Sequence, residues 1–174
     1  MVLSISAWLK IVTGRNRSKR RGSALHICAG SEKELEAVFR LNQQCFPEAW
    51  SQEGLRQALN SGYDLWLCLE EGRLQGYILS QDIIDEVHIL QLAVAAEARR
   101  QGIGTILVLH LLKQKRDMAF MLLEVRASNV AAIRLYEKTG FVIAGVRKGY
   151  YQPRGEIGRE DAVQMRFDLD KRLT

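Results

Sequence analysis

The sequence has few of the residues that define several common protein classes. It holds only two prolines and 14 glycines among 174 residues, and 47% of its residues are hydrophobic, which excludes collagen-like and disordered chains. It has no run of 18 or more apolar residues, so we expect no membrane-spanning helix. Its cysteines, Cys28, Cys45 and Cys68, match neither zinc-ligand spacing nor a disulfide framework, and its three histidines form no metal-binding pair. We therefore expect reduced, mostly buried thiols in a cytoplasmic protein without a metal.

The excess of positive charge is confined to one end of the sequence. Residues 1–22 hold six of the 25 basic residues and no acidic residue, so the remainder carries 19 basic and 20 acidic side chains. With a net charge of −1, the body is not expected to bind nucleic acid through a general basic face. We interpret 1–22 as a disordered basic extension, because its cations follow its apolar residues, the reverse of a secretory signal. The alternatives are weak contact with RNA or an anionic membrane, and a misassigned start codon.

Changes in hydrophobic period divide the rest of the sequence into alternating strands and helices. Ser31 and Glu34 form a capping box, and Ser51 is placed to cap a second helix. The predicted strands are 25–29, 64–70, 73–84, 86–95, 118–126, 141–151 and 161–169, and the predicted helices are 31–45, 51–59, 103–115 and 130–138. This order predicts a single α/β domain over residues 23–174, with a mixed sheet and helices on both faces.

A glycine-containing loop lies between the fourth predicted strand, 86–95, and the helix that follows. It reads Arg99-x-x-Gly102-x-Gly104, and Arg100 adds a second cation. Unsatisfied N–H groups at a helix N-terminus bind phosphate, and glycines let a ligand approach them without a Cβ in the way. The loop lacks the spacing of a Walker motif and the third glycine of a dinucleotide fingerprint. A pyrophosphate site and an ordinary strand-to-helix turn with solvated arginines are both compatible with this spacing.

Two further residues suggest acid–base chemistry. Glu124 lies within a strand that otherwise reads as buried, so its charge requires either an ion-pair partner or a catalytic role. It is either a general base or the partner of Arg126 or another cation. Tyr136, on the next helix, is either a core aromatic or a proton donor to a thiolate leaving group. Asn129 is placed to cap that helix, although its amide could also hold a ligand.

Several motifs occur together in one order and at compatible spacings, and they resemble the GNAT superfamily of acetyltransferases. Within it they resemble the RimI type, the ribosomal-protein-alanine N-acetyltransferases, over residues 25–168. Besides the glycine loop, the motifs are Leu123-Glu124-Val125-Arg126-Ala127-Ser128-Asn129, Leu135-Tyr136, Gly140-Phe141, Tyr150-Tyr151 and Arg159-Glu160-Asp161-Ala162. The resemblance implies a GNAT fold, with a mostly antiparallel sheet of about seven strands and a splayed central strand pair.

The resemblance also implies roles for individual residues. It implies that acetyl-CoA is the co-substrate. It also implies that the acceptor is the N-terminal alanine of the small-subunit ribosomal protein numbered eighteen. Glu124 matches the proton acceptor and Tyr136 the proton donor. The residues that match the coenzyme site are Leu92, Ala93 and Val94 along the pantetheine arm, Arg99, Arg100, Gln101, Gly102, Ile103, Gly104 and Thr105 around the pyrophosphate, and Asn129.

Three other functions are compatible with parts of the sequence. A GNAT enzyme could act on another protein N-terminus, on a lysine or on a small-molecule amine. A regulatory module could bind acyl-CoA without catalysis, although the presence of both Glu124 and Tyr136 argues against this. An RNA-associated module could use the basic extension, although the net charge of the body disfavours it. We expect a monomeric enzyme.

Overall fold

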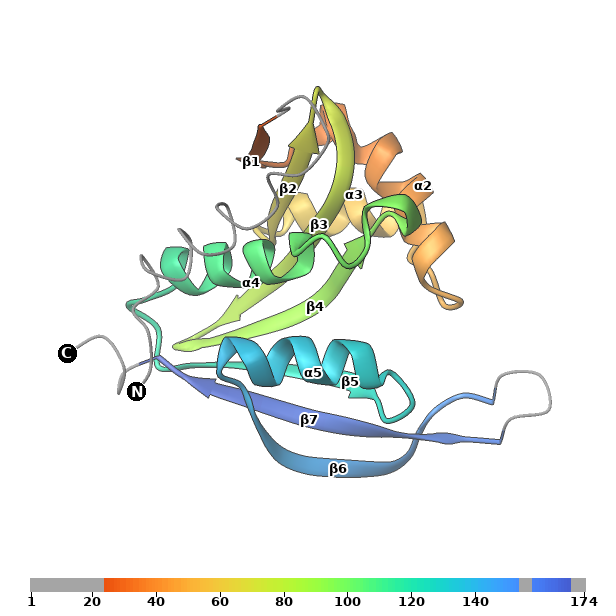
Figure 1. Ribbon diagram of the computed structural model, residues 1–174, viewed down its shortest axis with the longest axis vertical. Coiled ribbons are helices and arrows are strands. Elements are labelled where there is room, and N and C mark those ends of the chain that lie inside the picture. Colours follow the sequence, from red (N-terminus) through yellow and green to blue (C-terminus); the bar gives the residue numbers. More distant parts are fainter. Residues whose placement is uncertain (1–23, 154–157, 170–174) are drawn as a thin grey trace.

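The computed structural model describes residues 24–153 and 158–169, which form one seven-stranded sheet (Figure 1). The strand order is β1-β2-β3-β4-β5-β7-β6, and every neighbouring pair is antiparallel except β4 and β5. The strands are β1 (Leu25–Ala29), β2 (Asp64–Glu70), β3 (Arg73–Ile83), β4 (Glu86–Val94), β5 (Phe120–Arg126), β6 (Val142–Tyr151) and β7 (Glu160–Asp168). The predicted element order and the mostly antiparallel mixed sheet are confirmed, with bounds that shift by one or two residues.

The helices begin and end at the expected polar and glycine signals. They are η1 (Glu32–Glu34), α2 (Leu35–Cys45), α3 (Gln52–Asn60), η2 (Ala96–Ala98), α4 (Ile103–Gln114) and α5 (Val130–Thr139). The Ser31–Glu34 capping box is present, but it opens the short 3₁₀ turn η1 instead of the α-helix itself. Ser51 Oγ accepts the N–H of Gly54 and caps α3. The predicted basic extension lies outside the described residues.

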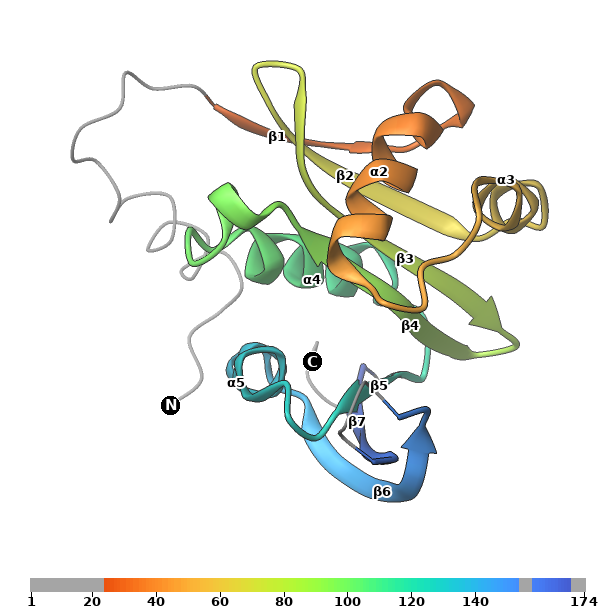
Figure 2. The same ribbon diagram turned by 90° about the vertical axis from the view of Figure 1, so that its right-hand side faces the viewer.

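Helices α2 and α4 cover opposite faces of the sheet (Figure 2). On one face, Nδ2 of the fully buried Asn42 in α2 donates to Tyr77 Oη and to Gln91 Oε1, both at 2.8 Å. On the other face, a Cβ added at Gly104 in α4 would lie 3.7 Å from the Leu92 side chain. Successive residues of a strand point to opposite faces of the sheet, so Gln91 faces α2 and its neighbour Leu92 faces α4.

A bulge in β4 marks the point where the sheet splits. Ser80 pairs with Ile89 and Leu79 with Gln91, so Leu90 is an extra residue without a partner on β3. On its other side, β4 pairs with β5 only over 86–89 and 120–123. Beyond that point the two strands diverge, because a bulge bends its strand and increases the local twist. The predicted splayed central pair is thus confirmed.

The cysteines are less buried than the sequence suggests. All three are free thiols, but only Cys68 is buried, whereas Cys28 and Cys45 are half-buried. Burial raises the pKa of the Cys68 thiol to about 11, with smaller contributions from Glu70 and Cys28. Among the helices of the described residues, none is long and apolar enough to cross a membrane.

Candidate active site

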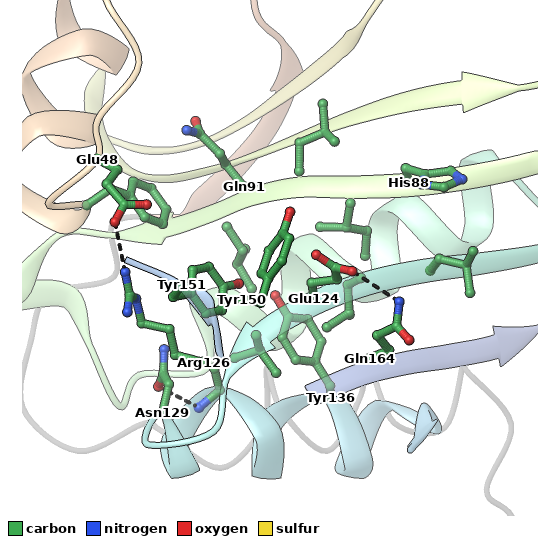
Figure 3. Close-up of a pocket in the computed structure, with 18 of the residues that line it drawn as sticks. Glu48, His88, Gln91, Glu124, Arg126, Asn129, Tyr136, Tyr150, Tyr151 and Gln164 are labelled. Atoms are coloured by element: carbon green, nitrogen blue, oxygen red, sulfur yellow. Dashed lines mark hydrogen bonds and ion pairs between the residues drawn. The ribbon is translucent and has the colours of Figure 1, made fainter. Parts of the chain in front are cut away.

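A cavity of about 630 Å³ opens where β4 and β5 diverge (Figure 3). One wall comes from β4 and another from β5 and α5. The loop between α2 and α3, the two ends of β6 and the middle of β7 at Gln164 complete the lining. The polar and aromatic residues that line it are Phe46, Glu48, Trp50, His88, Gln91, Glu124, Arg126, Asn129, Tyr136, Tyr150, Tyr151 and Gln164.

Glu124 occupies the wall formed by β5. Its Oε1 accepts hydrogen bonds from Arg147 Nη1 at 2.8 Å and from Gln164 Nε2 at 3.0 Å, and its side chain is 26% exposed. The cation that pairs with it is therefore Arg147 of β6 and not Arg126. The described residues give Oε2 no hydrogen bond, so that oxygen can receive a proton or a donor from the cavity.

Tyr136 reaches the same cavity from α5. Its ring is 6% exposed and packs edge-on against Phe141, with centroids 5.6 Å apart. Figure 3 shows its hydroxyl directed into the space that Glu124 also faces. Burial, and to a lesser extent Tyr151, raises the pKa of the Tyr136 hydroxyl above its usual value of about 10. The phenol therefore keeps its proton at neutral pH and can donate it.

The end of β4 presents free backbone groups along the cavity side. Ala95 N–H donates to Gln75 O at 2.8 Å, and Tyr77 pairs with Ala93 in the same ladder. Hydrogen-bonded pairs alternate along an antiparallel ladder, so the backbone groups of Ala93 are directed at β3, and those of Leu92 and Val94 face the open side. Val94 O accordingly accepts Arg99 Nε at 3.1 Å.

The loop before α4 is shaped by two residues with left-handed backbone conformations. Arg100 has a φ of 63°, and Gly102, the N-cap of α4, has a φ of 86°. The first backbone hydrogen bond of α4 runs from Ile106 N–H to Gly102 O. The N–H groups of residues 103–105 are therefore directed outward, at the positive end of the helix dipole.

Helix packing gives Gly104 a second reason to be a glycine, in addition to the approach of a ligand that the sequence suggests. A Cβ there would lie 2.7 Å from Leu135 Cδ1, so this glycine allows α4 and α5 to pack closely. Asn129 Oδ1 accepts Ala132 N–H at 3.2 Å, which confirms that it caps α5, and Asn129 also lines the cavity.

An arginine with two carboxylate partners closes one end of the mouth. Arg126 donates from Nη2 to Glu48 Oε1 at 3.0 Å and from Nη1 to Glu160 Oε2 at 3.1 Å. Its guanidinium carbon also lies 4.2 Å from the ring centroid of Tyr151. Glu160 accepts Ser128 N–H at 2.7 Å, and this bond and Arg126 together lower the pKa of Glu160.

Four of the candidate residues from the sequence line the cavity, namely Leu92, Glu124, Asn129 and Tyr136. The others, Ala93, Val94 and residues 99–105, continue from the cavity along β4 to the start of α4 and do not line it. No local pattern in the sequence indicates Arg147 and Gln164 as partners of Glu124, because they lie 23 and 40 positions from it. Only the register of β5 with β7, which pairs Glu124 with Gln164, could have indicated the second contact.

Comparison with known proteins defines the class. The sequence profile of the acetyltransferase (GNAT) family matches residues 35–141, more than half of the sequence. The chain therefore belongs to the acetyltransferase (GNAT) family, and it is an acetyl-CoA-dependent N-acetyltransferase.

Two relatives and one solved structure within this family resemble the chain over most of its length. The chain is 35% identical over 138 residues to the [ribosomal protein bS18]-alanine N-acetyltransferase of Escherichia coli K12, which covers 78% of this chain and 92% of the relative. It is 33% identical over 141 residues to the enzyme of that name from Salmonella typhimurium, covering 80% and 94%. The crystal structure of the Escherichia coli ribosomal-protein-S18-alanine N-acetyltransferase superposes with a TM-score of 0.78 at 32% identity, over 84% of this chain and 94% of that one.

Proposed function

We propose that this protein transfers the acetyl group of acetyl-CoA to the N-terminal alanine of a small-subunit ribosomal protein, the counterpart of bS18. The names of the relatives at 33–35% identity support this acceptor. The observation that carries the chemistry is that Glu124 and Tyr136, a proton acceptor and a proton donor, face one cavity from two different elements.

The open edge of β4 and the start of α4 fit acetyl-CoA. The backbone groups of Leu92 and the N–H of Val94 face the open side and can pair with the amide-bearing pantetheine arm, as an added strand would, whereas Val94 O already accepts Arg99 Nε. The outward N–H groups of residues 103–105, with Arg100 beside them, suit its pyrophosphate. A solved structure of yncA from Salmonella typhimurium is described with its cofactor acetyl-CoA, and this chain shares its fold with a TM-score of 0.73 at 18% identity.

The coenzyme supplies an acetyl thioester, and the residues of the chain move the protons. An α-amino group has a pKa of about 7.7–8.0, so Glu124 accepts a proton from the acceptor, directly or through water. The amine nitrogen forms a bond to the acetyl carbon while Val94 N–H stabilises the oxyanion. The carbon–sulfur bond then breaks, and Tyr136 donates its proton to the departing thiolate. The nitrogen of the new amide releases its second proton, which restores the Tyr136 phenol through water.

Other acceptors remain compatible with the cavity, including a different protein N-terminus, a lysine side chain or a small-molecule amine. A non-catalytic acyl-CoA-binding module is disfavoured because it has no need for a carboxylate and a neutral phenol at the same point.

Mass spectrometry tests the proposal most directly. The protein should add one acetyl group to the α-amine of a peptide with the ribosomal protein's N-terminal sequence, and none to the same peptide with a blocked α-amine. Acetylation of lysine alone would contradict the proposed acceptor.

The Glu124→Gln variant tests the mechanism in the same assay. It should lower kcat by roughly 10²- to 10⁴-fold while leaving the Kd for acetyl-CoA unchanged, because a general base acts on the acceptor. A wild-type rate at neutral pH would make Glu124 a structural residue.

A further inference from the structure

The mouth of the cavity is bridged by one guanidinium. Arg126 stands at the end of β5, Glu160 at the start of β7 and Tyr151 at the end of β6, whereas Glu48 belongs to the loop 46–51 between α2 and α3. The sheet has already split between β4 and β5 at this level. The Glu48–Arg126 contact therefore joins two halves of the protein that the sheet no longer connects (Figure 3).

Among the described residues, this contact is the only side-chain hydrogen bond that crosses the open end of the split. Arg126 is buried enough to be a fixed anchor, since its side chain is 13% exposed and that of Glu160 is 16% exposed. Glu48 is 57% exposed and reaches Arg126 from outside. Arg126 and Glu160 therefore form the fixed side of the contact, and the exposed Glu48 forms the side that can move.

The loop held in this way forms part of the cavity wall. Phe46, Pro47 and Trp50 line the cavity together with Glu48. Most of the proposed coenzyme groups lie on the open edge of β4 and at the start of α4. Asn129 contacts Arg126 through the backbone, because its N–H donates to the Arg126 carbonyl at 2.9 Å, but the Arg126 guanidinium is held by Glu48, Glu160 and Tyr151. The loop therefore borders the side of the cavity that remains for the acceptor.

We propose that Arg126 is a positioning residue that latches the loop 46–51 through Glu48 and thereby shapes the acceptor side of the cavity. The acceptor part of this inference rests on the proposed function. An arginine suits the task, because its planar fork can hold two carboxylates at once while its face stacks on Tyr151. Ordering the loop before the acceptor arrives removes an entropic cost of binding.

A double-mutant cycle with Glu48→Gln and Arg126→Gln tests the latch. Glu48→Gln should raise the KM for the acceptor peptide about tenfold, with kcat within about twofold and an unchanged Kd for acetyl-CoA. In the Arg126→Gln background, the Glu48→Gln change should raise that KM less than about twofold further, because its partner is already gone. Glu53→Gln is the matched control, since it removes a carboxylate 61% exposed that pairs with Arg56 outside the cavity. It should leave all three constants unchanged.

Two outcomes of the cycle would overturn the latch. If Glu48→Gln alone leaves the acceptor KM unchanged, the contact does not shape the site. If Glu48→Gln raises the KM equally with and without Arg126, Glu48 contacts the acceptor itself and is not held for it by Arg126.

Hydrogen exchange provides a readout that does not depend on activity. The amides of the loop 46–51 should exchange faster in Glu48→Gln and in Arg126→Gln than in the wild type or in Glu53→Gln. Unchanged exchange in Glu48→Gln would overturn the latch even in an active enzyme. If no peptide is acetylated, the proposed function fails, and faster exchange would still support the latch.

Discussion

Arg147 and Glu124 form an ion pair between β6 and β5, with Nη1 2.8 Å from Oε1. Arg147 also stacks on Tyr150, with its guanidinium carbon 3.9 Å from the ring centroid. With Gln164 as the second donor, Oε1 is fixed in place, and Oε2 has no hydrogen bond among the described residues of this cavity-lining side chain. We infer that Arg147 orients the proton acceptor without contacting the substrate.

Replacing Arg147 should therefore impair turnover more than binding. Arg147→Met should lower kcat roughly tenfold, because a misplaced catalytic group loses rate, and leave the Kd for acetyl-CoA unchanged. Steady-state kinetics and calorimetry measure the two quantities. The matched control is Lys148→Met, which removes the neighbouring cation, 84% exposed and paired with Asp161. Equal losses in the two variants would mean that only the general charge of β6 matters.

Tyr136→Phe separates packing from chemistry. The described residues give the Tyr136 hydroxyl no hydrogen bond, so the free energy of unfolding should fall by less than about 1 kcal/mol. We expect kcat to fall strongly, and a thioester whose thiol has a lower pKa should restore part of it. Tyr77→Phe is the control for a loss of stability, because it removes the hydrogen bonds of the Tyr77 hydroxyl with Asn42 and Gln91 in the core. Parallel losses of stability and rate in Tyr136→Phe, without rescue, would exclude the proton-donor role.

Gly102→Ala tests the proposed pyrophosphate site. The φ of 86° makes any side chain strained by about 1–2 kcal/mol, so the loop should relax away from its N–H cradle and the Kd for acetyl-CoA should rise. Gly140→Ala, at a φ of 102° at the end of α5, is a control for the loss of stability alone. Calorimetry on both variants decides the assignment, which an unchanged Kd in Gly102→Ala would contradict.

His110 should make stability depend on pH. Its Nε2 is buried without a hydrogen-bond partner among the described residues, and its ring packs edge-on against Trp66 at 4.4 Å. Burial, followed by Lys113, lowers the pKa of His110 in the folded state. The unfolded chain then binds more protons below about pH 6.5, so stability should fall as the pH drops through that value.

Urea unfolding at about pH 7.5 and pH 5, followed by tryptophan fluorescence, measures this effect. His110→Leu should remove most of the difference between the two pH values, whereas substitution of the exposed His26 should keep it. If His110→Leu retains the full difference, other groups cause the pH dependence.

The order of strands and helices could be predicted because its signals are local. Capping at Ser51 and the periods of the apolar residues each depend on a few neighbouring positions. The boundary of β5 shifted to Phe120 because residues 118 and 119 are apolar but lie in the turn after α4, where Ala119 N–H donates to Asp85 O.

The contacts of the candidate site could not be predicted in the same way. The partners of Glu124 come from β6 and β7, and which cation faces it depends on strand register and on the curvature of β6. The sequence favoured Arg126 because it shares a face of β5 with Glu124, but that guanidinium turns toward Glu48 and Glu160. The packing of Gly104 against Leu135 could not be predicted for a similar reason, since Leu135 is 31 positions away and belongs to another helix.

Leu90 gives the fold an unusual tolerance to a deletion. Because Leu90 is the unpaired residue of the bulge, removing it would leave Gln91 opposite Leu79 and every later residue of β4 on its present face. The ladder would then become regular and the bend would disappear. A shortened chain of this kind would retain its hydrophobic core while β4 and β5 could pair along their whole length, which would close the space between them. The single unpaired residue of β4 thus stands at the point where the pairing of β4 with β5 ends and the cavity begins.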